Sequence, residues 1–146
     1  MLGDDKGSAW RGNPALDGGL TARMTSEATG RHLLVVEDEP LVAMMLQDVL
    51  DEAGYVVIGP IAQLDSAVEA AREQAIDLAL LDVNLMGKQV YPVAVVLAAR
   101  GIPFLFMTGY GDGSLPAEYA GRPAVAKPYK MKALLDALEA LRPATG

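Results

Sequence analysis

Four short apolar segments, each followed by a polar residue, constrain the fold of this chain most strongly. They are Leu33–Val36 before Glu37 and Asp38, Leu78–Leu81 before Asp82, Pro103–Met107 before Thr108, and Pro123–Ala126 before Lys127. Continuous apolar runs of this length are typical of strands that are buried on both faces of a parallel sheet. Open parallel sheets bind ligands at the carboxyl ends of their strands, so we expect these polar side chains to converge in one pocket.

The converging groups predict a cation site. Three carboxylates at close range, from Glu37, Asp38 and Asp82, repel one another unless a cation lies between them. A cluster of oxygen ligands that leaves room for water suits Mg²⁺. The hydroxyl of Thr108 and the ammonium of Lys127 beside such an ion suggest that the site receives a phosphoryl group.

Composition indicates one soluble domain. The chain has 146 residues, of which 51% are hydrophobic, and this is enough to bury a core. A formal net charge of −7 leaves no basic stripe for nucleic acid, and the lack of Cys excludes disulfides and thiolate metal sites. We find no apolar run of the ~18 residues that a membrane span needs, and no signal-peptide core. We therefore expect a cytoplasmic protein with no nucleic-acid or membrane partner.

Helical patterns alternate with the apolar runs from residue 31 onward. Helices are predicted over 40–53, 65–75, 90–100 and 129–142, a further strand over 55–61, and at most a short helix near 115–120. Strands that alternate with helices predict βαβ units around a parallel sheet.

The two ends of the chain differ from this pattern. Residues 1–30 hold six glycines and no apolar period, so we expect a flexible extension there. The alternative is an arm that docks through Trp10. Residues 143–146 are expected to be a short C-terminal tail.

The segments Val35–Pro40 and Leu80–Leu85, together with Thr108 and Lys127–Pro128, resemble the receiver domain of bacterial two-component response regulators. The resemblance covers about 31–142. It implies a doubly wound, flavodoxin-like α/β fold with five parallel strands in the order 2-1-3-4-5. The stretch 101–111 is also similar to a subgroup of single-domain receivers with the sequence Phe-x-Phe-Ala-Thr-Gly-Tyr, although Met107 replaces the Ala.

The resemblance implies a role for each residue of the predicted pocket. Asp82 would be the nucleophile that accepts the phosphoryl group, Lys127 would pair with one phosphoryl oxygen, and Thr108 would hydrogen-bond another. Mg²⁺ would bridge the nucleophile and the phosphoryl oxygens. Its implied ligands are Glu37, directly or through water, Asp38, Asp82 and the backbone carbonyl of Asn84.

Two positions depart from the general receiver pattern. Many receivers have an aromatic residue three positions before the Lys, where this chain has Ala124. Tyr110 is the nearest candidate to replace that aromatic as a switch. Met86 stands where a Pro is common.

The predicted function is that of a stand-alone receiver. It would be a regulatory phosphoacceptor that promotes its own phosphorylation and dephosphorylation, rather than an enzyme. A histidine kinase or phosphotransfer protein would supply the phosphoryl group, and output would pass through protein–protein contacts or a phosphate-sink role. One alternative is a magnesium phosphatase with an aspartyl nucleophile, which normally has a second Asp where Asn84 stands. The other is a degenerate receiver that serves only as an interaction module.

Overall fold

The five predicted strands form one parallel sheet. The computed structural model describes residues 30–109, 115–127 and 130–141. Its sheet contains β1 (His32–Val36), β2 (Val56–Ile61), β3 (Leu78–Asp82), β6 (Phe104–Thr108) and β7 (Ala124–Ala126). They are ordered β2-β1-β3-β6-β7, which is 2-1-3-4-5 when only the strands of this sheet are counted. The predicted flavodoxin-like topology is therefore confirmed.

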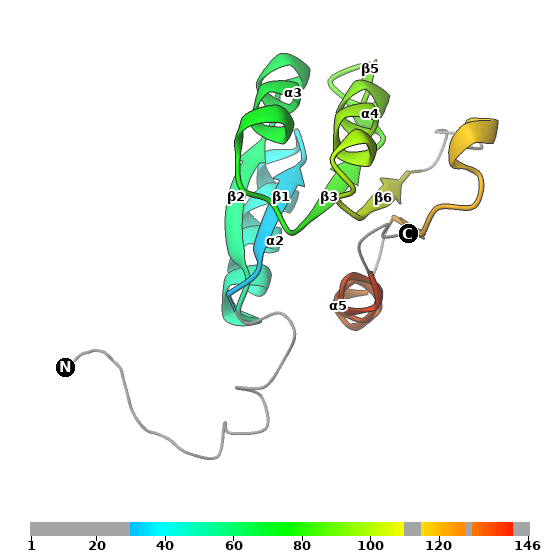
Figure 1. Cartoon of the computed structure of the whole chain (residues 1–146). Coiled ribbons are helices and arrows are strands. Elements are labelled where there is room, and N and C mark those ends of the chain that lie inside the picture. Colours follow the sequence, from blue (N-terminus) through cyan, green and yellow to red (C-terminus); the bar gives the residue numbers. More distant parts are fainter. Residues whose placement is uncertain (1–29, 110–114, 128–129, 142–146) are drawn as a thin grey trace.

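Four helices cover the two faces of the sheet. They are α2 (Pro40–Glu52), α3 (Leu64–Glu73), α4 (Tyr91–Ala99) and α5 (Met131–Ala140). Figure 1 shows α3 and α4 side by side on one face, while buried residues of α2 and α5 form a second cluster on the opposite face. Each helix and strand of this framework lies within two residues of its predicted bounds. None of the helices in the described ranges is both long and apolar enough to cross a bilayer.

The central strands are buried on both faces. In β1, Leu33 and Val35 contact the cluster beneath α2 and α5, whereas Leu34 and Val36 contact the cluster beneath α3 and α4. All five residues of β3 are buried. This double burial explains why the strands read as continuous apolar runs instead of alternating patterns.

Proline and glycine mark the helix ends that the sequence predicted. Pro40 occupies the first turn of α2, where its missing N–H costs no helical hydrogen bond. Gly54 has a φ of 106° just after α2, and Gly101 has a φ of 73° just after α4. These left-handed conformations end a helix and favour glycine, which has no Cβ to clash.

Between β6 and β7, where at most a short helix was predicted near 115–120, the chain forms a single 3₁₀ turn, η1 (Ala117–Tyr119). One local feature differs from the prediction. After β3, the chain forms an antiparallel hairpin, β4 (Asn84–Leu85) and β5 (Lys88–Gln89), which the sequence analysis did not predict. Residues 1–29, 110–114, 128–129 and 142–146, which include Trp10, Tyr110 and Pro128, lie outside the described residues, so the expectations for them stay predictions.

Candidate functional site

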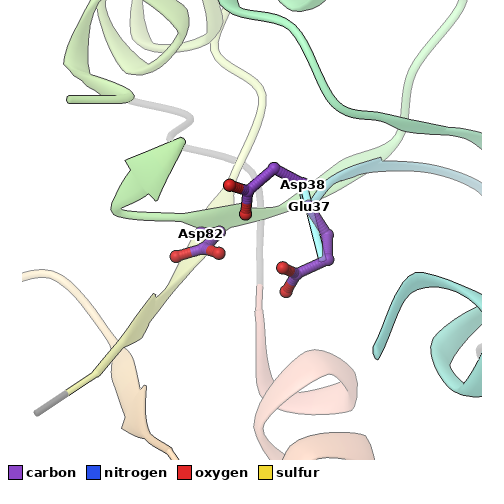
Figure 2. A group of neighbouring side chains, drawn as sticks. All are labelled: Glu37, Asp38 and Asp82. Carbon is purple, nitrogen blue, oxygen red and sulfur yellow. The ribbon is translucent and has the colours of Figure 1, made fainter. Parts of the chain in front are cut away.

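Three carboxylates gather at the carboxyl ends of β1 and β3. Glu37 and Asp38 directly follow β1, and Asp82 is the last residue of β3, which pairs with β1. Figure 2 shows the three side chains gathered at this edge. One carboxylate oxygen from each lies within 4.8 Å of the other two. The convergence that the apolar runs predicted is therefore present.

Glu37 is the most buried member of this cluster. Its side chain is fully covered, and one oxygen, Oε2, accepts a hydrogen bond of 3.0 Å from the amide of Glu39. The other oxygen, Oε1, is buried without a hydrogen-bond partner and lies 3.5 Å from Nζ of Lys127. Burial, assisted by the nearby charge of Asp82, raises the pKa of Glu37 to about 7, against the opposing effects of the Glu39 amide and Lys127.

Lys127 closes the cluster from the end of β7. Its Nζ donates a hydrogen bond of 2.9 Å to Oδ2 of Asp82. Burial opposes the ammonium charge, but the hydrogen bond and charge of Asp82, with the charge of Glu37, outweigh it and raise the pKa of Lys127 above its usual value. Lys127 therefore remains a cation beside the acids.

Thr108 lies at the end of β6, next to β7. Its backbone carbonyl accepts a hydrogen bond of 2.7 Å from the amide of Lys127, and it pairs with Ala126 across the two strands. Gly109, the following residue, lines the cleft above the carboxylates. The structure thus brings Thr108 and Lys127 to one edge of the sheet, as their positions after two apolar runs predicted.

The unpredicted hairpin supplies two backbone amides to the site. The amide of Asn84 donates to Oδ1 of Asp82 at 3.2 Å, and the amide of Met86 donates to Oδ2 of Asp38 at 2.8 Å. The Asn84 side chain turns back and accepts a hydrogen bond from the Gly87 amide at 3.1 Å. Sequence reasoning identified Asn84 but missed the amide of Met86. Gly87 was the only local sign of a turn there.

The cleft suits a small cation with oxygen ligands. It has a volume of about 230 Å³ and is lined by Asp38, Glu39, Asp82, Asn84, Met86, Gly87, Gly109 and Lys127. Carboxylate and carbonyl oxygens are the ligands that Mg²⁺ prefers. The buried Oε1 of Glu37 lacks a hydrogen-bond donor, which a cation or its water shell would compensate. The residues present therefore fit a magnesium ion.

Comparison with known proteins identifies the family. The model of the response regulator receiver domain matches residues 33–139, which is most of the chain. This chain belongs to the receiver domain family. Receiver domains are regulatory phosphoacceptors of two-component systems and bind Mg²⁺ in an acidic pocket. The fold and the gathered acids of this receiver agree with that assignment.

Solved receivers share this architecture. SdrG from Sphingomonas melonis Fr1 is 42% identical, with a TM-score of 0.67, over 77% of this chain and 95% of SdrG. The receiver domain of the sensor histidine kinase PA1611 from Pseudomonas aeruginosa PAO1 is 27% identical, with a TM-score of 0.62, over 76% of this chain and 95% of that chain. The latter structure has a magnesium ion coordinated in its active-site cleft.

A curated relative is considerably longer than the matched receiver. The transcriptional regulatory protein PdtaR of Mycobacterium tuberculosis is 32% identical over 116 residues, which are 77% of this chain and 57% of PdtaR. This receiver thus spans little more than half the length of that relative. The match supports the receiver assignment. The rest of PdtaR lies outside the part that aligns with this chain.

Proposed function

We propose that Asp82 is the phosphoacceptor of this receiver. The observation that carries the proposal is the position of its carboxylate at the end of β3, where Lys127 binds one oxygen and the Asn84 amide binds the other. These two contacts hold the carboxylate at the floor of an open cleft that a phosphodonor can enter. Attack by a carboxylate oxygen forms a new P–O bond and yields an acyl phosphate.

The phosphodonor in this proposal is a histidine kinase or a phosphotransfer protein. The P–N bond of its phosphohistidine breaks as the P–O bond to Asp82 forms, and the electron pair of the broken bond stays on the imidazole. The exposed apolar side chains of Leu41, Met44 and Met45 on α2 offer a docking surface next to the cleft. The exposed acids of the same helix, Asp48 and Asp51, would orient a basic partner.

A magnesium ion, when bound by Glu37, Asp38, Asp82 and the carbonyl of Asn84, would supply positive charge to the transferring phosphoryl group. Lys127 already lies against Asp82, so a small shift of its ammonium would let it pair with a phosphoryl oxygen. Thr108, one strand away, would donate its hydroxyl to another phosphoryl oxygen. The chain segment after β6 would move with Thr108 and report the phosphorylated state to a partner.

Output in this proposal passes through protein–protein contacts, with a phosphate-sink role as the second possibility. The cytoplasm is the compartment in which we expect the protein to meet its kinase.

Two other functions are disfavoured. A magnesium phosphatase with an aspartyl nucleophile would need a second acid two residues after Asp82. In this chain Asn84 occupies that position, and its side chain accepts a hydrogen bond from the Gly87 amide. A degenerate interaction module would not need the complete set of acids, Thr108 and Lys127.

Incubation with acetyl phosphate and Mg²⁺, followed by intact mass spectrometry, tests the proposal. The wild-type chain should gain one phosphoryl group, and Asp82→Asn should gain none. Asp77→Asn is the matched control, because Asp77 is exposed at the opposite end of β3 and should leave phosphorylation unchanged. A phosphoryl group mapped to another residue, or retained in Asp82→Asn, would refute the assignment.

A further inference from the structure

The β4–β5 hairpin has an unusual turn. Met86 and Gly87 connect its two strands, with φ values of 52° and 82°. Positive φ at both corners is the signature of a type I′ turn, which normally has Asn, Asp or Gly at its first corner. Met86 has a Cβ and no short polar side chain, so the left-handed conformation is strained at this corner. Strained residues of this kind persist where surrounding contacts hold them.

One contact that holds this turn from outside the hairpin is a hydrogen bond to a predicted metal ligand. The Met86 amide donates to Oδ2 of Asp38 at 2.8 Å, across 48 positions of sequence. A carboxylate has a second oxygen, so one oxygen of Asp38 is fixed by the amide and the other can bind a cation. Two positions earlier in the same hairpin, the Asn84 amide fixes Oδ1 of Asp82.

We propose that the hairpin is the positioning element of the magnesium site, and that the Met86 backbone amide orients Asp38 for the ion. This inference rests on the proposed function. Outer-shell hydrogen bonds set the orientation of metal-binding side chains, and their loss costs roughly 10–100-fold in metal affinity. The positioning role belongs to the amide of Met86 and not to its side chain, which is 64% exposed.

Magnesium titration of three variants by calorimetry tests this role. Although a Pro is common at this position in other receivers, Met86→Pro in this hairpin removes the amide that binds Asp38 and forces a negative φ, so the Mg²⁺ affinity of the variant should fall about tenfold or more. Met86→Ala retains the amide and should retain affinity within about twofold of wild type. Gln89→Ala, a control in the opposite strand of the hairpin, should do the same. Equal affinity in Met86→Pro and wild type would overturn the proposal, and so would an equal loss in Met86→Ala and Met86→Pro.

A second measurement needs no metal and does not depend on Met86→Pro folding. Hydrogen exchange of the Met86 amide, followed by NMR in EDTA, should become about tenfold faster or more when Asp38→Ala removes its acceptor. The Asn84 amide, whose acceptor is Asp82, should change less. Unchanged exchange at Met86 would overturn the proposal. A wild-type chain that binds no Mg²⁺ would instead refute the proposed function, so the two failures are distinguishable.

Discussion

The charges at the end of β1 and β3 do not balance in the absence of a cation. Glu37 and Asp82 are both buried, Asp38 is half-buried beside them, and the ammonium of Lys127 lies within 3.5 Å of Glu37 and 2.9 Å of Asp82. One ammonium faces three carboxylates, and Glu37 responds by retaining its proton to an unusually high pH. At the scale of single residues, the site therefore stores an unfavourable energy that a bound cation would relieve.

The proton on Glu37 gives a pH-dependent prediction for the metal-free protein. The pKa of Glu37 rises from 4.5 to about 7 on folding, so the folded chain binds this proton more tightly than the unfolded chain does. The corresponding stability is present below the unfolded pKa and is lost as the pH rises through the folded pKa. Glu37→Gln should therefore raise the free energy of unfolding by about 1–3 kcal/mol near pH 8, and by little near pH 4. Urea unfolding in EDTA at both pH values measures this, and an equal effect at both would contradict it.

Asp38 gives a second prediction at the same scale. Asp38→Ala removes a metal ligand and should weaken Mg²⁺ binding by more than the roughly 10–100-fold expected for loss of an outer-shell partner. The metal-free variant should be no less stable than wild type, because relief of repulsion offsets the lost hydrogen bond to the hairpin. Titration calorimetry and urea unfolding measure the two effects. Normal Mg²⁺ affinity in Asp38→Ala would remove Asp38 from the ligand set.

Among the elements, η1 lies in the segment where the sequence predicted at most a short helix. Its Tyr119 is buried and stacks on Tyr91 at the start of α4, with ring centroids 5.4 Å apart. The edges and faces of Phe104 and Phe106 from β6 complete the cluster at centroid distances of 6.3 and 5.5 Å. Arg122 lies 4.7 Å above the ring of Phe104. One aromatic side chain thus anchors a segment that is too short to be stable as a helix by itself.

Loss of this anchor should be costly. Tyr119→Ala should lower the free energy of unfolding by about 2–5 kcal/mol, because it empties a buried aromatic site. Tyr119→Phe keeps the ring and its stacking on Tyr91, so it should change stability by less than about 1 kcal/mol. Urea denaturation compares the two variants. Similar losses in both would mean that the hydroxyl, and not the ring, is what holds η1.

The same segment should respond to occupation of the phosphoryl site. Phe106 contacts Tyr119 and lies two residues before Thr108 in β6, so a shift of Thr108 toward a phosphoryl group would be transmitted to η1. With Mg²⁺ and the phosphoryl mimic beryllofluoride, amide exchange over 115–120 should change, and Thr108→Ala should abolish that change. A response confined to α2 would show that the signal leaves by another face. The related prediction for Tyr110 concerns a residue outside the described ranges and needs the same experiment.

At the scale of the whole molecule, the described part of the receiver begins at Gly30, which is hydrogen-bonded to the rest of the domain. Its amide donates to the carbonyl of Gly54 at 2.8 Å, directly before β1 begins. Both clusters of buried residues are composed of side chains from residue 33 onward. The core as described thus draws on no residue of the predicted extension.

Truncation tests the predicted domain boundary. A chain that lacks residues 1–28 but keeps Gly30 should unfold within a few degrees of the full chain, because no described core contact is lost. It should also gain one phosphoryl group from acetyl phosphate. Differential scanning calorimetry and intact mass measure these properties. A marked fall in unfolding temperature would mean that the extension contributes to the core, as the alternative of an arm docked through Trp10 predicts.

The sequence alone was sufficient to predict the framework and the gathering of charged side chains at one edge of the sheet. Continuous apolar runs identify doubly buried strands, and the polar residues that follow them must meet at one edge because parallel strands all point the same way. The meeting of Glu37, Asp38, Asp82 and Lys127 follows from that rule. The ends of α2 and α4 lie within two residues of their predicted bounds, and Pro40, Gly54 and Gly101 stand at these ends because their effects on the backbone are local.

The tertiary structure alone decided the features that depend on distant contacts. The hairpin after β3 contains only two residues per strand and a Met at a corner that disfavours it, so its sequence carries a weak local signal. One of its amides, that of Met86, donates a hydrogen bond to Asp38, which is 48 positions away in the sequence. The same is true of η1, which relies on Tyr91 and β6, and of the raised pKa of Glu37, which arises from burial among groups of three different strands. Local patterns specify elements, whereas the energy of a strained turn or a buried charge is set by neighbours that only folding brings together.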